Sequence, residues 1–133
     1  MSVERVTYLD SSAIVKVIVR EPESTALRAY LRGRGPVVSS ALARTEVARA
    51  VLGLGSAVER RAQDALARIE LVRINDRVLV AAGTLRPLEL RFLDAIHLAT
   101  ALLVGEALGQ FVVYDAKLAK ACRAAGIKTA SPC

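Results

Sequence analysis

Short β-prone apolar runs alternate along the chain with longer segments in which apolar residues recur at helical spacing. A spacing of two predicts strands, and a spacing of three to four predicts helices. The expected strands are residues 6–9, 37–38, 69–74, 111–114 and 127–129. Because these strands alternate with helices, the pattern predicts a three-layer α/β/α fold with a central, mainly parallel sheet.

Cap and turn residues set the expected helices between these strands. Ser11 and Ser12 are expected to cap a helix that Pro22 ends, and Ser56 with Glu59 forms a capping-box pattern. Further helices are expected after Ser24, over 41–54, from Asn75 or Asp76 through Leu85, over 93–104 and over 117–125. The segment 93–104 is almost entirely apolar, which predicts a buried central helix.

Four carboxylates stand at the edges of apolar segments: Asp10, Glu46, Asp94 and Asp115. Asp10 and Asp115 directly follow expected strands, Asp94 opens the apolar helix, and Glu46 lies about one turn inside another helix. In parallel α/β sheets, ligands collect beyond the carboxyl ends of the strands. We therefore expect the four carboxylates to converge there. Their desolvation is costly unless a cation compensates for it, so they are candidate metal ligands.

This donor set points to a hard divalent ion. Carboxylate oxygens suit Mg²⁺ or Mn²⁺, and the set contains neither a His pair nor the thiolates that zinc favours. Two carboxylates about 4 Å apart repel by roughly 4 kcal/mol at an effective dielectric near 20, so a bound cation would relieve the crowding. Such an ion can polarise a phosphodiester and lower the pKa of a bound water. The predicted reaction is phosphodiester hydrolysis.

Composition limits the number of domains, the kind of substrate and the cellular compartment that we expect. The 133 residues fit one domain, spanning 1–133, and 53% hydrophobic residues can form a core. The net charge of +6 suits a polyanionic substrate such as nucleic acid, although many basic domains bind none. Cys122 and Cys133 are interpreted as free thiols in a reducing compartment. No apolar stretch reaches the roughly 20 residues that span a bilayer, so we expect a soluble, cytoplasmic protein without a membrane partner.

The motifs, taken in order, resemble a known family. Asp-Ser-Ser at 10–12, Glu46, Leu-Asp-Ala-Ile-His-Leu-Ala at 93–99 and Tyr-Asp-Ala-Lys-Leu at 114–118 resemble the PIN-domain ribonucleases of the VapC toxin type, from type II toxin–antitoxin systems. The resemblance runs from Val6 to the C-terminus. It implies a PIN-like fold and a Mg²⁺- or Mn²⁺-dependent endoribonuclease that cleaves selected RNAs, often tRNA, and inhibits translation. It also implies a homodimer and a small VapB-like antitoxin that covers or enters the active site.

The resemblance also implies a role for each candidate residue. Glu46 would ligate metal or position water, and Ser12 would hold the first aspartate or a metal-bound water. Val113 departs from the family pattern, which commonly has Thr or Ser two residues before its last aspartate. Hydroxyl support for that aspartate would then be missing. The implied metal ligands, and with Glu46 the implied catalytic residues, are Asp10, Asp94 and Asp115.

Several candidates also have a purely structural interpretation. Asp10 and Asp94 could each cap a helix, as aspartates at helix starts commonly do. Ser12 could cap the same helix and hold Asp10 at once. His97 lies one turn after Asp94, but the apolar helix around it favours a hydrogen-bonded core histidine over a catalytic one.

Arg91 and Lys117 flank the acids and have two interpretations. They could hold RNA phosphates as substrate-positioning residues, or they could be ordinary surface charges. Two other classes of protein share some of these features. A phosphoacceptor receiver domain would need an acidic pair at the first strand, where serines follow Asp10 instead. The alternative to a nuclease is a catalytically inactive PIN-like module that binds RNA or protein.

Overall fold

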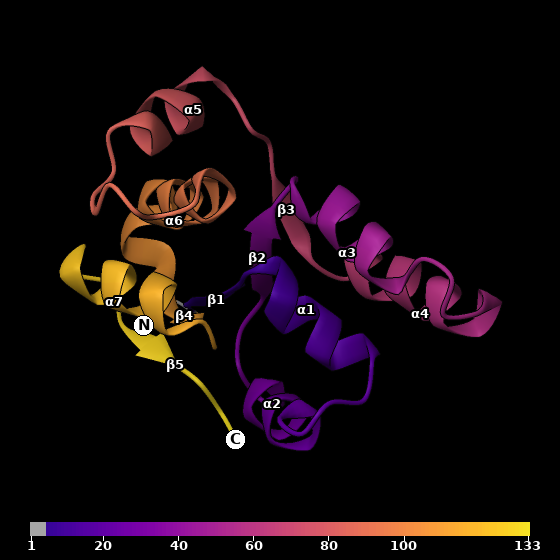
Figure 1. Cartoon of the computed structure of the whole chain (residues 1–133). Helices are drawn as coiled ribbons and strands as arrows, with labels where there is room; N and C mark the ends of the chain where they lie inside the picture. The colour runs from indigo at the N-terminus through magenta and orange to yellow at the C-terminus, as the bar shows by residue number, and fades with distance from the viewer. Residues whose placement is uncertain (1–4) are drawn as a thin grey trace.

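Five parallel strands form one sheet at the centre of the computed structural model, which describes residues 5–133 (Figure 1). They are β1 (Val6–Leu9), β2 (Val37–Ser40), β3 (Glu70–Val72), β4 (Leu108–Val112) and β5 (Thr129–Ala130). Their order in the sheet is β3-β2-β1-β4-β5, and each neighbouring pair is parallel. β1 is the central strand, so its C-terminal end lies in the middle of one sheet edge.

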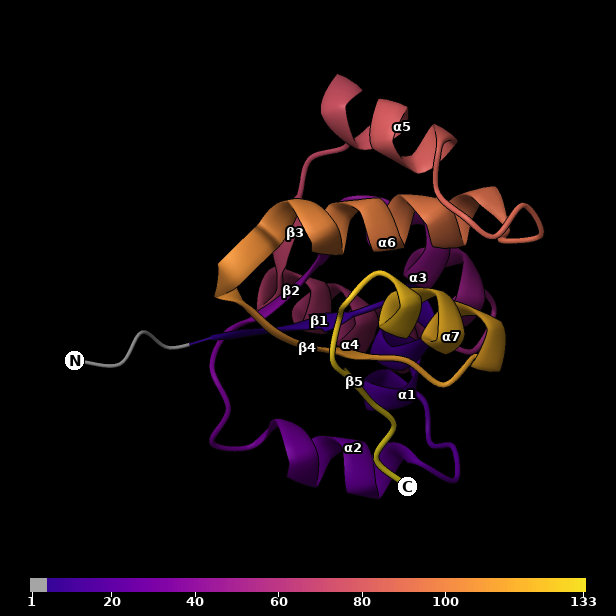
Figure 2. The same ribbon diagram turned by 90° about the vertical axis from the view of Figure 1, so that its left-hand side faces the viewer.

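Helices cover both faces of this sheet. Figure 2 shows α6 and α7 over one face, with α1 and α2 on the other and α5 stacked outside α6. No helix within residues 5–133 is long and apolar enough to cross a membrane. The helices are α1 (Ser11–Ile18), α2 (Ser24–Leu31), α3 (Ala43–Val51), α4 (Ser56–Ala67), α5 (Asp76–Gly83), α6 (Phe92–Val104) and α7 (Ala116–Ala124), and a 3-10 turn, η1, covers Gly105–Ala107.

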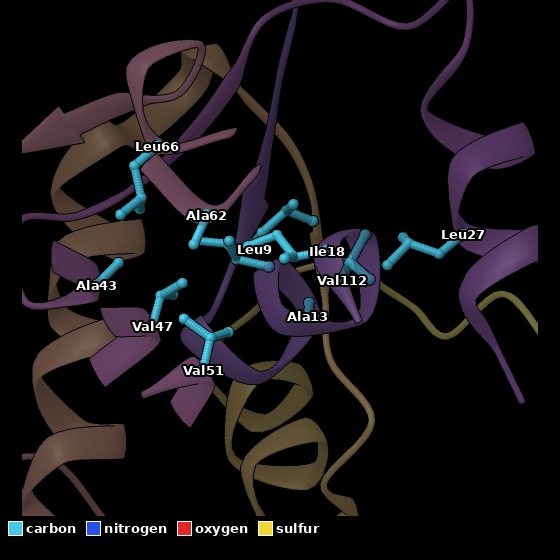
Figure 3. Close-up of a cluster of buried hydrophobic side chains, with 11 residues drawn as sticks. Leu9, Ala13, Ile18, Leu27, Ala43, Val47, Val51, Ala62, Leu66 and Val112 are labelled. Carbon is cyan, nitrogen blue, oxygen red and sulfur yellow. The ribbon is translucent and has the colours of Figure 1, made fainter. Parts of the chain in front are cut away.

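Alternation along the strands builds two separate hydrophobic cores. Leu9 of β1 and Val112 of β4 pack with α1 to α4, and Figure 3 shows Leu27 extending toward this cluster from α2. Their neighbours Tyr8 and Phe111 pack with α6 and α7 instead. Successive strand side chains point to opposite faces, so each strand serves both cores. The predicted three-layer α/β/α fold is confirmed.

The register of the central strands brings two of the acidic segments together. Leu9 is the neighbour of Val112, so β1 and β4 end at the same level of the sheet. Asp10 follows β1 directly, and Asp115 follows β4 three residues later. Both segments therefore leave the sheet at its C-terminal edge.

Several predicted boundaries differ from the observed ones; β4, for example, covers Leu108–Val112 rather than 111–114. In three places a competing local interaction explains the difference. α1 begins at Ser11 with Asp10 as its N-cap, so Ser11 and Ser12 lie inside the helix. The capping box at Ser56 is absent, because Gly55 takes the N-cap position with a φ of 108° and Ser56 is the first helical residue. The last strand begins at Thr129, because the Ile127 amide first bonds the Cys122 carbonyl and closes α7.

Candidate active site

The four predicted carboxylates line one cavity at the C-terminal edge of the sheet. Its volume is about 570 Å³. Asp10 enters from the end of β1, Glu46 from α3, Asp94 from α6 and Asp115 from the start of α7. The remaining lining residues are Ser11, Ser12, Arg91, Phe92, Leu93 and His97. The fold therefore brings together acidic residues that are more than one hundred positions apart in the sequence.

Asp10 is the most buried of the four carboxylates, with 5% of its surface exposed. Its Oδ1 accepts hydrogen bonds from the Ala13 amide at 2.9 Å and the Ser12 hydroxyl at 3.0 Å. Burial raises the pKa of Asp10, and the charge of Asp94 raises it further, although these hydrogen bonds and His97 act in the opposite direction. Asp10 thus caps α1 and also lines the cavity, so its role as a helix cap does not remove it from the candidate site.

Glu46 is fixed by two donors on the inner wall of the cavity. Its Oε1 accepts from the Ser11 hydroxyl at 2.5 Å and from His97 Nε2 at 2.8 Å. Burial alone would raise the pKa of Glu46, but these hydrogen bonds outweigh it and hold the pKa below its usual value. Glu46 is therefore ionised at neutral pH and held in one orientation.

His97 is a buried, hydrogen-bonded histidine, and its partners connect it to the cavity. It is 2% exposed, and its Nδ1 lies 2.8 Å from the hydroxyl of fully buried Tyr8. Burial raises the pKa of Tyr8, so the hydroxyl keeps its proton. Because the Glu46 carboxylate can only accept, the shared proton lies on His97 Nε2, and Nδ1 forms the hydrogen bond with Tyr8. The chain of Tyr8, His97 and Glu46 is therefore directed toward the cavity.

Arg91 bridges the other two acids. Its Nε lies 3.4 Å from Asp94 Oδ2, and one terminal nitrogen lies 3.7 Å from Asp115 Oδ2. The pKa of Asp94 is raised by burial and by Asp115, against the opposing effect of Arg91. Asp94 makes no cap bond: it is the third residue of α6, whose N-cap is Arg91. The interpretation of Asp94 as a helix cap is therefore wrong.

The two carboxylate oxygens of Asp115 make different contacts. Oδ1 accepts from the Leu118 amide at 2.8 Å and caps α7, while Oδ2 faces Arg91. Val113 lies in the core between the sheet and α6 and α7, so its side chain does not line the cavity. Lys117 lies outside the acidic cavity and lines an adjoining hollow together with Arg91 and Asp115.

Two residues that line or support the cavity went unnoticed in the sequence. Ser11 is part of the Asp-Ser-Ser motif and an expected cap residue, but its own contribution to the site, a hydroxyl that holds Glu46, was not predicted. Tyr8 lies two residues before Asp10, so its side chain points to the same face of the strand. His97 lies three residues after Asp94 and shares its helix face, a spacing that pointed toward the cavity.

The donor chemistry of the cavity fits a hard divalent ion. Within residues 5–133, no three Asp, Glu, His or Cys side chains converge closely enough to form a complete protein ligand set. Mg²⁺ needs no such set, because it keeps several waters and is usually bound through one or two carboxylates and substrate phosphates. Asp94 raises the pKa of Asp10, and Asp115 raises the pKa of Asp94, so the carboxylates repel one another across the cavity. The residues present therefore fit Mg²⁺ or Mn²⁺ with water completing the coordination.

Comparisons with known proteins agree with this geometry. Residues 7–124 match the PIN domain family. Ribonuclease VapC46 of Mycobacterium tuberculosis (strain ATCC 25618 / H37Rv) is 54% identical over 125 residues, which cover 94% of this chain and 96% of the relative. Mycobacterium tuberculosis VapC20, a sarcin-ricin loop cleaving toxin, has a similar fold, with a TM-score of 0.69 at 15% identity over 91% of this chain and 95% of that one. A toxin–antitoxin complex from Klebsiella pneumoniae gives 0.66 at 21% identity, over 84% and 88%.

The family match spans most of the chain, and the identity to a named relative extends over nearly the full length of both proteins. The solved structures share the fold at low sequence identity. The resemblance inferred from the four acidic motifs is therefore confirmed. This chain belongs to the PIN-domain family and, within it, to the VapC ribonucleases.

Proposed function

We propose that this chain, acting as one nuclease domain over residues 1–133, is a metal-dependent endoribonuclease toxin that hydrolyses RNA and thereby inhibits translation in the cytoplasm. The observation that carries the proposal is the cavity lined by four carboxylates, in which Asp10 is buried and, among residues 5–133, its carboxylate accepts hydrogen bonds only from the Ala13 amide and the Ser12 hydroxyl. Burying an ionised carboxylate without a cation carries a high desolvation free energy, and a divalent ion would offset it. Its membership of the VapC ribonucleases makes RNA the expected substrate.

Asp10, Asp94 and Asp115 would hold Mg²⁺ or Mn²⁺, with Glu46 as a further ligand or as the residue that orients the attacking water. The ion would supply charge stabilisation for the phosphate and a water of lowered pKa. Glu46 is ionised and its Oε1 is occupied by Ser11 and His97, so Oε2 is the atom suited to accept a proton from water. Ser12 would keep Asp10 in its cavity-facing rotamer through the 3.0 Å hydrogen bond.

Arg91 is proposed to contact the RNA phosphate. It is 77% exposed, and its distances of 3.4 and 3.7 Å to Asp94 and Asp115 describe weak ion pairs. A divalent ion held by the two aspartates would offset their charge, and the Arg91 guanidinium would then bind a phosphate oxygen, a pairing that its planar donors favour. Lys117 lies on the next hollow and would contact a neighbouring phosphate.

A VapB-like antitoxin and a second copy of the chain are the proposed protein partners. The similar solved assembly from Klebsiella pneumoniae is a toxin–antitoxin complex, which supports the first partner. Exposed apolar side chains support protein contact in general, since Val80 of α5, Leu88 and Phe92 are each more than 70% exposed. Phe92 also lines the acidic cavity, so a partner seated there would obstruct it.

The test is cleavage of total host RNA by the purified chain, freed of any partner, in Mg²⁺ or Mn²⁺, with the new ends sequenced. Discrete cuts that disappear with EDTA and in Asp94→Asn support the proposal. Asp64→Asn is the matched control, because Asp64 is exposed on α4 and lines no part of the acidic cavity. RNA binding without cleavage under any divalent ion would favour the inactive binding module. Cuts that persist in Asp94→Asn would indicate a contaminating nuclease.

A further inference from the structure

The acidic cavity continues into two further hollows along α7. The middle hollow, of about 420 Å³, shares Arg91, Asp94 and Asp115 with the acidic cavity. The far hollow, of about 520 Å³, shares Glu89, Leu90 and Lys117 with the middle one. Because each hollow shares walls with the next, the three form one open path from the acidic cavity along the surface. We call the far hollow the α7 groove; it is lined by Arg86, Pro87, Glu89, Leu90, Lys117, Lys120, Ala121 and Ala124.

The charge of the path changes sign along its length. The acidic cavity holds four carboxylates and one arginine. The α7 groove holds three cations, Arg86, Lys117 and Lys120, against the single acid Glu89, and all four of these residues are exposed. A polyanion lying along the path would meet metal-binding acids at one end and side-chain cations at the other. This order of charges suits an RNA strand whose cleaved phosphate lies in the acidic cavity.

The floor of the α7 groove is apolar. Lys117, Lys120, Ala121 and Ala124 recur at helical spacing and occupy one stripe of α7, with the lysines toward one end of the stripe and the alanines toward the other. The segment 86–90 forms the opposite wall, where Pro87 and partly buried Leu90 face the stripe. Small and apolar side chains edged by cations match a nucleobase beside its phosphates.

We propose that the α7 groove is a subsite for an unpaired nucleotide of the RNA strand next to the cleaved bond. Arg86 and Lys120 bind its phosphates, and the base packs on Pro87, Leu90 and Ala121. The base must leave its stack to reach this floor, so the subsite selects single-stranded RNA over duplex RNA. The inference rests on the proposed nuclease function, and it assigns substrate contacts beyond Arg91 and Lys117.

Two matched double variants test the subsite. Arg86→Ala with Lys120→Ala removes two cations of the groove, and Arg123→Ala with Lys128→Ala removes two exposed cations outside it. Binding is measured with a labelled, unstructured oligouridylate in the Asp94→Asn background at several salt concentrations, with duplex RNA and a polyglutamate peptide as comparison probes. In the active background, kcat and KM are measured at a cut site mapped in total RNA.

We expect the groove variant to bind the oligouridylate roughly tenfold more weakly. The slope of log K against log salt concentration should also be shallower by about 1.4, which corresponds to two lost phosphate contacts on a single strand. Its KM should rise by a larger factor than its kcat falls, while the control variant matches the parent. Equal losses in both double variants would overturn the subsite, because they would reflect net charge alone. Equal losses for duplex RNA, or tighter binding of polyglutamate than of RNA, would also overturn it.

A second substitution tests the groove without removing a cation. Ala124→Glu places a carboxylate at the alanine end of the groove, at an exposed helical position where Glu is a good helix former. Ala67→Glu on α4 is its control. The first should weaken oligouridylate binding and the second should not, whereas unchanged binding in both would contradict the subsite. Because binding is read in the Asp94→Asn background, absence of cleavage would refute the nuclease without removing the test of the subsite.

Discussion

Tyr8→Phe tests whether the buried chain of Tyr8, His97 and Glu46 holds the cavity in its active arrangement. The substitution removes one hydroxyl, which lies 2.8 Å from His97 Nδ1 in a fully buried position. The ring itself is retained, so its packing on Phe111, with centroids 4.6 Å apart, and its edge contact with His97 persist. No large cavity forms, and the effect isolates the hydrogen bond.

The magnitude follows from leaving a buried polar atom, His97 Nδ1, without its hydrogen-bond partner. His97 Nδ1 would lose its hydrogen bond at a site that is 2% exposed, which costs about 1–3 kcal/mol of unfolding free energy. A second effect reaches Glu46. Without the Tyr8 hydroxyl, the ring is held only at Nε2 and can turn away from the Glu46 carboxylate. Loss of one of the two bonds to Glu46 should lower kcat by about tenfold, equivalent to about 1.4 kcal/mol.

Urea unfolding at fixed protein concentration measures the first effect, and cleavage of a mapped RNA site measures the second. Tyr30→Phe is the control, because its hydroxyl makes no hydrogen bond with the part of the chain that the structure describes, and it should change neither quantity. His97→Gln keeps a donor for Glu46 and should retain more activity than His97→Ala. If Tyr8→Phe matches the parent within about 0.5 kcal/mol and cleaves RNA equally fast, the reasoning about this chain of hydrogen bonds fails.

Three further predictions concern stability. Millimolar Mn²⁺ should raise the melting temperature of the parent. Asp94→Asn should be no less stable than the parent without metal, since it removes a carboxylate whose pKa is raised by burial, and its melting temperature should not respond to Mn²⁺. A less stable variant would indicate a structural role for Asp94. Because the pKa of Asp10 is raised above its ordinary 3.8, this carboxyl binds protons more readily in the folded metal-free protein than in the unfolded chain. Its contribution to the unfolding free energy should therefore rise as pH falls from neutral toward 3.8, opposite in sign to that of Glu46, whose pKa is lowered, and urea midpoints of Asp10→Asn should lack this contribution. Leu27→Ala removes the buried side chain through which α2 contacts the core, and it should lower the unfolding free energy in urea by about 2–5 kcal/mol. The exposed Leu88→Ala should lower it by less than about 0.5 kcal/mol, and similar losses in both variants would show that α2 packing contributes little.

Much of the fold could be predicted because the information is local. The period of apolar residues identifies a strand or a helix within a few positions, and an aspartate after a strand lies at the sheet edge whatever the rest of the chain does. This is why Asp10 and Asp115 could be placed at one edge from sequence. The boundaries were less secure, since competing local bonds decide them: Asp10 rather than Ser11 caps α1, and the Ile127 amide turns back to α7 before β5 begins.

Only the tertiary structure decided how the acidic residues are supported. His97 meets Glu46 across 51 positions and Tyr8 across 89, because α3 and α6 approach the end of β1 from different parts of the chain. Sequence spacing gives no measure of such contacts, so His97 could be recognised as buried and hydrogen-bonded but not as the partner of Glu46. The α7 groove has the same origin, because the helical stripe is visible in the sequence but the wall at 86–90 is not. The sequence by itself determined the element types and the acidic motifs, since both depend on neighbouring residues; packing decided which side chains meet, since that depends on how the layers are assembled.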